Sequence, residues 1–180
     1  MIDDILEFNR HFVEDKGYER YITSKYPDRK VAIVTCMDTR LVELLPAALG
    51  IRNGDAKVIK NAGGVISSPF CTAVRSVLVG IYELGVEDVM VIGHLDCGAQ
   101  HISGDEMIRL MLDRGISQKA IDMCRYFDID FDHWLSGFET VERSVHESVK
   151  ILKEHPLIPE DVRIWGFVID SVTGKLTPVE

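Results

Sequence analysis

The sequence predicts an α/β fold, with a central, mainly parallel sheet flanked by helices in a single domain, residues 1–180. Short β-rich segments alternate with segments whose apolar residues recur every three or four positions, as in βαβ units. Three of the β-rich segments are apolar almost without interruption, which is typical of strands covered on both faces. A chain of 180 residues is near the usual size of one domain, so a second core is not expected.

Four segments are predicted to be strands: 30–35, 56–60, 88–93 and 162–169. The stretch RLVELLPAALG predicts a short helix between the first two strands, and Pro46 kinks or restarts it. The stretch SPFCTAVRSVLVGIYELG has helical periodicity and ends at Gly85, a common stop signal. It is therefore expected to be the crossover helix between the second and third strands.

Two further helical regions complete the predicted fold. Residues 104–154 show no strand pattern and are expected to form a helical insertion before the last strand. This insertion should end in one long helix with an apolar face made by Trp134, Phe138, Val141, Val145, Val149 and Leu152. Residues 1–17 are amphipathic and predict an N-terminal helical arm that packs on a second subunit, with an apolar side made by Ile2, Ile5, Leu6, Phe12 and Val13.

The charge of the chain argues against nucleic acid as a partner. The 29 acidic and 20 basic residues give a formal net charge of −9, and no Lys/Arg cluster stands out, so phosphate backbones are repelled on average. The first residues, MIDDILEFNR, lack the basic and apolar regions of a signal peptide. No apolar stretch has the length of a bilayer span. We therefore expect a cytoplasmic protein with no membrane partner.

Chemically reactive residues follow two of the predicted strands. The first strand runs into CMDTR, with Cys36, Asp38 and Arg40, and the third ends in GHLDCG, with His94 and Cys97. In open α/β sheets, ligands bind outside the carboxyl ends of strands, where successive connections leave in opposite directions. If the first and third strands are neighbours, as in the strand order 2-1-3-4, the two thiols and the imidazole meet in one site.

Two sulfur ligands and one imidazole suit Zn²⁺. Three protein ligands are typical of a catalytic zinc, because the fourth position stays open for water or substrate. Cys36, His94 and Cys97 are therefore the expected ligands of one Zn²⁺ per chain. The other two cysteines, Cys71 and Cys124, lie inside predicted amphipathic helices and are expected to be packing thiols.

Each of these residues also has a purely structural interpretation. Cys36 could be a buried inert thiol, and Asp38 could cap the next helix with Arg40 as an exposed ion-pair partner. His94 could be a hydrogen-bonded core histidine, and Cys97 could pack beneath the turn that follows it. Their coincidence at two strand ends favours a shared site over five independent structural roles.

The pair of motifs C-x-D-x-R and H-x-x-C-G, here CMDTR and HLDCG, resembles the β-class carbonic anhydrases. The likeness extends to KVIKNAGG and to HPLIPEDVRIWGFVIDSVTGKL, so it covers most of residues 30–178. The resemblance implies a zinc-dependent lyase that interconverts carbon dioxide and bicarbonate. It also implies a homodimer or a multiple of dimers, with the N-terminal helix embracing the partner. Leu95 and Asp96 depart from the H-Y-G-C-G of the plant-like branch.

The resemblance implies a role for each site residue. Cys36, His94 and Cys97 match the metal ligands, and Asp38 and Arg40 match the catalytic pair. We expect Asp38 to accept a hydrogen bond from the zinc-bound hydroxide that attacks carbon dioxide, while Arg40 holds the carboxylate in place. Asp38 is also a conditional fourth zinc ligand, in a closed state. His101 follows the metal loop and is either a proton relay or an ordinary surface histidine.

Three other functions are compatible with parts of this pattern. Relatives with the same ligands hydrolyse carbonyl sulfide or carbon disulfide, so the ligands do not fix the substrate. A zinc-binding or thiol-sensing module without turnover is disfavoured, because a structural site does not require Asp38 and Arg40. A nucleotide-binding protein is disfavoured because the first turn is CMDTRL rather than glycine-rich.

Overall fold

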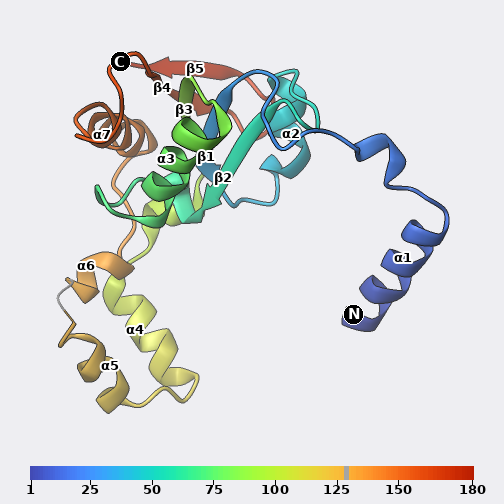
Figure 1. Ribbon diagram of the computed structural model, residues 1–180. Helices are drawn as coiled ribbons and strands as arrows, with labels where there is room; N and C mark the ends of the chain where they lie inside the picture. Colours follow the sequence, from blue (N-terminus) through green and yellow to red (C-terminus); the bar gives the residue numbers. More distant parts are fainter. Residues whose placement is uncertain (128–129) are drawn as a thin grey trace.

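The computed structural model describes residues 1–127 and 130–180 and contains a five-stranded sheet (Figure 1). The strand order is β2-β1-β3-β4-β5, and all neighbours are parallel except β4 and β5. The structure confirms the four predicted strands, and each strand end lies within one residue of its predicted position. Strand β5 was not predicted. The strands are β1 (Val31–Cys36), β2 (Ala56–Asn61), β3 (Asp88–His94), β4 (Arg163–Ile169) and β5 (Leu176–Val179).

The helices agree with the predicted α/β class. They are α1 (Ile2–Glu14), α2 (Leu41–Ala48), α3 (Thr72–Leu84), α4 (Gly104–Asp113), α5 (Gln118–Cys124), α6 (Phe131–Leu135) and α7 (Val141–Lys153). Gly85 ends α3 in the left-handed conformation (φ 72°), as its position in the sequence predicted. None of the described helices is both long enough and apolar enough to cross a bilayer.

Two predictions about helix positions were wrong. The long helix of the insertion begins at Val141, where the Thr140 hydroxyl caps it by accepting from the Arg143 N–H at 3.3 Å. Trp134 lies on the separate helix α6 and is exposed, and Phe138 lies in the segment between α6 and α7. Cys71 lies at the N-cap of α3 rather than inside it. Residues 128–129 of the predicted insertion lie outside the described residues.

Glycine lets α7 pack closely on the sheet. A Cβ atom on Gly93 would come within 2.8 Å of Val141 and Val145 side-chain atoms, and one on Gly166 would lie 3.0 Å from Val145. The buried core lies between these elements, and every residue of β1 is buried. The connection after β1 leads to β2, and the connection after β3 leads to β4, so the two connections leave in opposite directions along the strand order. A switch point therefore lies between β1 and β3.

Candidate metal centre

Cys36 is fixed at the carboxyl end of β1 by its neighbours on both sides. The Thr35 hydroxyl donates to the Ile92 carbonyl at 2.9 Å, and the Met37 N–H donates to the Asn61 carbonyl at 2.8 Å. Gly64, at φ 68°, packs directly beneath this point, since a Cβ atom there would lie 2.8 Å from the Cys36 nitrogen. A residue without a side chain is therefore required at position 64.

The structure brings the three predicted ligands into one buried cluster. Cys36, His94 and Cys97 each contribute a ligand atom, and these atoms lie within 4.8 Å of one another. The Cys36 and Cys97 sulfur atoms are 3.9 Å apart. His94 ends β3, the direct neighbour of β1, so the switch point predicted from the strand order is where the cluster forms.

The orientation of His94 leaves one ring nitrogen directed at the cluster. Nδ1 lies 2.9 Å from the Leu95 carbonyl, which assigns the ring proton to Nδ1. Nε2 is buried and has no hydrogen-bond partner among the described residues. A buried polar atom without a partner costs roughly 1–3 kcal/mol, which a bound metal would offset. The histidine is thus held as metal-ligating histidines usually are.

The donor set fits Zn²⁺, because two soft sulfur ligands and an imidazole match its preferences. Burial, with Cys36 close by, raises the pKa of the Cys97 thiol to about 11. The thiol is therefore protonated at neutral pH without metal. Since the thiolate is the form that binds, metal binding must release this proton.

Asp38 and Arg40 form a tight pair beside the cluster. The Arg40 Nε and Nη2 atoms donate to the two Asp38 oxygens at 3.0 and 2.9 Å, and the Arg40 backbone N–H adds a third bond at 2.8 Å. The Arg40 hydrogen bond is the main reason that the pKa of Asp38 falls to about 2. Asp38 Oδ2 lies 3.7 Å from His94 Nε2, so the carboxylate borders the cluster.

Asp96 is part of this site, although the sequence indicated no role for it. Its side chain accepts from Arg40 Nη1 at 2.9 Å, and its backbone carbonyl accepts from Arg40 Nη2 at 2.9 Å. Asp96 has a φ of 55°, in the left-handed region. The only signal in the sequence was the departure from H-Y-G-C-G at this position.

Two of the remaining reactive residues, His101 and Cys124, are not members of the three-ligand cluster. His101 occupies the exposed end of a short 3-10 turn, Gly98–His101, four residues beyond Cys97. Cys124 is the last residue of α5 and packs on the small core of the insertion. Among the described residues, no side-chain hydrogen bond joins His101, the predicted proton relay, to any of the three ligands.

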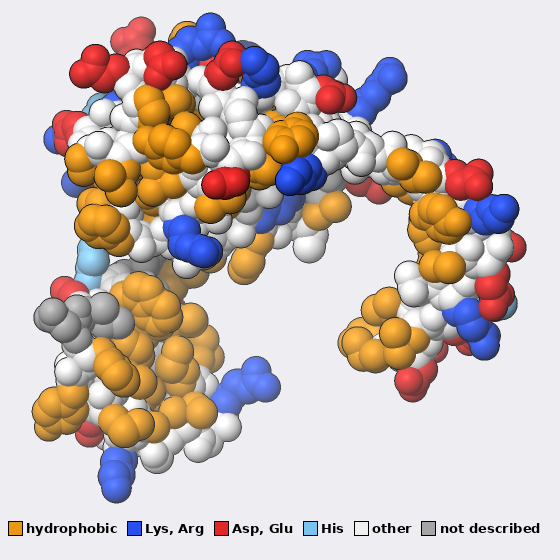
Figure 2. All heavy atoms as spheres, viewed as in Figure 1, with side chains coloured by type: hydrophobic (Ala, Val, Ile, Leu, Met, Phe, Trp, Pro, Cys, Tyr) orange, Lys and Arg blue, Asp and Glu red, His pale blue; other side chains and the backbone are white. Residues whose placement is uncertain are grey.

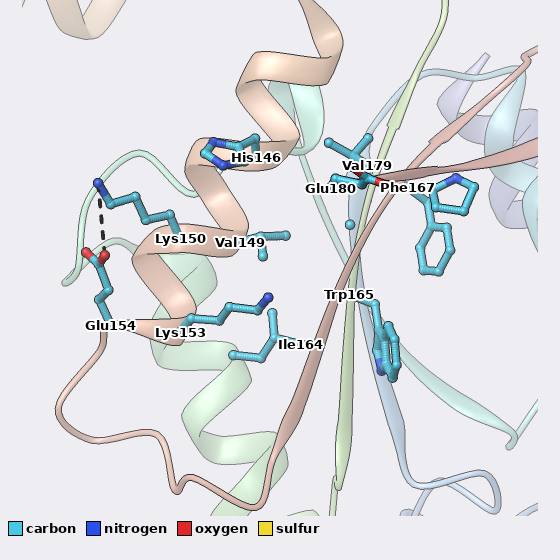
Figure 3. Close-up of a pocket in the computed structure, with 12 residues that line it drawn as sticks. His146, Val149, Lys150, Lys153, Glu154, Ile164, Trp165, Phe167, Val179 and Glu180 are labelled. Carbon is cyan, nitrogen blue, oxygen red and sulfur yellow. Dashed lines mark ion pairs between the residues drawn. The ribbon is translucent and has the colours of Figure 1, made fainter.

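A cavity of about 500 Å³ lies at another edge of the molecule (Figure 3). It is lined by α7 and by the β4–β5 edge, with Trp165 and Lys153 on opposite sides. None of Cys36, His94 and Cys97 lines it. The chemistry of the side chains, rather than the size of a cavity, therefore locates the candidate site.

Comparison with known proteins agrees with this geometry. The family model described as "Carbonic anhydrase" matches residues 31–176. A Bacillus subtilis protein named "Putative carbonic anhydrase YtiB" is 52% identical over 176 residues, covering 98% of this chain and 94% of the relative. A carbon disulfide hydrolase of Saccharolobus solfataricus is 33% identical over 161 residues, covering 83% of this chain and 76% of the relative.

A solved structure extends the comparison to the fold. The β-carbonic anhydrase isoform I of Trichomonas vaginalis has a TM-score of 0.90 at 38% identity, covering 99% of this chain and 97% of that one. The likeness includes the five-stranded sheet and almost the whole chain. The chain therefore belongs to the β-carbonic anhydrase family.

Proposed function

We propose that the protein catalyses the reversible hydration of carbon dioxide to bicarbonate and a proton, with one Zn²⁺ per chain. The observation that carries the proposal is the buried Cys36, His94 and Cys97 cluster with the Asp38–Arg40 pair at its border. Membership of a family of zinc enzymes supports it. A zinc ion held by these residues would lower the pKa of a bound water and so supply the nucleophile for carbon dioxide.

Asp38 supplies a hydrogen-bond acceptor at the edge of the metal centre. With a pKa of about 2, its carboxyl group is ionised throughout the neutral range and can only accept. Arg40 fixes both oxygens, so the acceptor direction is set before substrate arrives. Asp38 therefore orients the proton of the attacking water and leaves its lone pair free to face carbon dioxide.

Asp38 has a second role in this proposal, as a conditional fourth ligand. In the structure both of its oxygens bind Arg40, an arrangement that would leave the fourth position of a bound zinc ion to solvent. Closure requires the carboxylate to leave Arg40 and turn toward the three ligands. X-ray absorption of the zinc protein across the pH range would detect closure as a change in the oxygen shell, with the sulfur shell constant.

The second candidate function is hydrolysis of carbon disulfide or carbonyl sulfide, and the names of several relatives support it. Relatives named carbon disulfide hydrolase are 26–33% identical to this chain. The deciding experiment measures carbon dioxide hydration by stopped flow and sulfide release from both sulfur substrates, using one zinc-loaded preparation. The proposal would be supported if carbon dioxide hydration is faster than sulfide release and if Cys36→Ala abolishes the hydration. Sulfide release without hydration would replace it with the hydrolase, and neither reaction would leave a zinc-binding module.

A second copy of the chain is the proposed partner, as a homodimer or a multiple of dimers in the cytoplasm. Helix α1 extends away from the sheet (Figure 1) and contains no buried residue. Figure 2 shows hydrophobic side chains along this arm, and its exposed apolar residues are Ile2, Ile5, Leu6, Phe8 and Val13. Light scattering should give the mass of a dimer or a larger assembly, and Leu6→Asp should weaken this assembly. A parent protein that is monomeric at micromolar concentration would contradict the assignment.

A further inference from the structure

We infer that Asp96 is a positioning residue, which fixes the Arg40 guanidinium so that Arg40 can fix Asp38. The inference rests on the proposed function, since Asp38 matters through the reaction at the metal centre. It is carried by the hydrogen bonds around Arg40 and by the backbone conformation of Asp96.

The guanidinium of Arg40 is held along two of its edges. Nε and Nη2 face the Asp38 carboxylate, while Nη1 and Nη2 face the side chain and carbonyl of Asp96. Because the guanidinium is planar, contacts on two edges fix both its direction and its rotation. With the Asp96 side chain removed, Nη1 loses its carboxylate partner, and the second edge is held only by the bond from Nη2 to the backbone carbonyl of residue 96, so the guanidinium is held less firmly.

The exposure of the two side chains shows that this contact adds little to folding. The Asp96 side chain is 87% exposed and that of Arg40 is 39% exposed. Ion pairs so open to solvent contribute little to stability. Loss of the Asp96 carboxylate should therefore leave the fold intact and change the geometry of the Asp38–Arg40 pair.

The backbone at Asp96 allows function to be separated from stability. At a φ of 55°, glycine is unstrained and asparagine is better tolerated than most residues. If residue 96 served only the turn, the Asp96→Gly variant would be at least as stable and as active as the parent protein. If Asp96 positions Arg40, activity should fall in the order Asp, Asn, Gly, because asparagine can still accept from Nη1. Stability should stay constant or rise in the same order.

The test compares Asp96→Asn and Asp96→Gly with the parent protein. The matched control is Asp132→Asn, which removes an exposed carboxylate bonded to Arg125 at 2.9 Å on α6. The first readout is the rotation rate of the Arg40 guanidinium, from nitrogen-15 NMR of the metal-free proteins. Rotation should be slow in the parent and the control and faster in both Asp96 variants. This readout does not depend on which reaction the protein catalyses.

The second set of readouts uses the zinc-loaded proteins. Both kcat and kcat/KM for carbon dioxide hydration should fall by about twofold to fivefold in Asp96→Gly, with zinc content and melting temperature maintained. Unchanged Arg40 rotation in Asp96→Gly would overturn the inference, as would activity losses that follow a loss of stability. Faster rotation in the two Asp96 variants, together with a parent protein that has no hydratase activity, would instead retain the positioning role and overturn the proposed reaction.

Discussion

The sulfur atoms of Cys36 and Cys97 lie 3.9 Å apart, although 61 positions separate the two residues in the sequence. Both cysteines are buried and free. They meet because β1 and β3 are parallel neighbours, with Thr35 opposite Ile92 near their carboxyl ends. Two thiols in this position can share a metal ion, and the ionised forms would repel each other without one.

Removal of any proposed ligand should remove the metal. We expect about one zinc per chain in the parent protein and a large loss of zinc in Cys36→Ala, His94→Ala and Cys97→Ala, since each leaves only two ligands. Elemental analysis of dialysed protein measures this. Cys124→Ala, which changes a thiol outside the cluster, is the matched control. Full zinc content in Cys36→Ala would refute the ligand assignment.

Asp38→Ala and Arg40→Ala should separate catalysis from metal binding. Both variants should keep the zinc, because neither residue belongs to the three-ligand cluster. Hydration should fall by at least about tenfold, because the oriented acceptor is lost in the first variant and misplaced in the second. Stopped-flow rates and zinc content, measured on the same samples, test this. Parental turnover in either variant would reduce the pair to a local structural contact.

The Cys36, His94 and Cys97 cluster was predicted on the condition that the strand order is 2-1-3-4, and the structure has that order among its first four strands. Parallel strands place their carboxyl ends together, which is why side chains at two strand ends could be joined in one site. Strand β5 was not predictable, since four residues that include Pro178 pair only in the presence of β4. Trp134 follows the helical period of α7, yet Thr140 starts a new helix. The role of Asp96 depends on its positive φ and on the Arg40 rotamer, which residue spacing does not encode.

Gly64→Ala should damage the metal centre more than a backbone change elsewhere. The new Cβ would lie 2.8 Å from the Cys36 nitrogen and 2.9 Å from the Thr35 carbonyl carbon, so β1 must shift. Gly50→Ala is the control: its φ of 61° is similar, but a Cβ there would meet nothing within 4 Å. Gly50→Ala should cost about 1 kcal/mol of unfolding free energy, and Gly64→Ala clearly more. Competition with a chelator should show weaker zinc binding in Gly64→Ala and unchanged zinc binding in Gly50→Ala. Equal effects of the two substitutions would contradict this packing argument.

Asp88 lies at the end of the sheet opposite the metal centre, and it should make the stability of the fold depend on pH. Its carboxylate pairs with Arg163 and accepts from the Trp165 indole N–H at 3.2 Å, and the Arg163 hydrogen bond is the main cause that lowers its pKa below the ordinary 3.8. A carboxyl group whose pKa is lower in the folded state stabilises the fold above about pH 4. This contribution is lost as the pH falls through the folded-state pKa.

The corresponding experiment compares the parent protein with Asp88→Asn in urea, both metal-free so that zinc release at low pH plays no part. At pH 7 the variant should be less stable by about 1 kcal/mol or less, because Arg163 is largely exposed and solvent screens the pair. Asparagine can still accept from Trp165, so the charge is the main difference between the two proteins. The gap should close as the pH falls below about 4 and through the lowered folded-state pKa of Asp88, as protonation removes the same charge from the parent. A difference in unfolding free energy that stays constant through this pH range would show that the Asp88–Arg163 ion pair does not contribute through its charge.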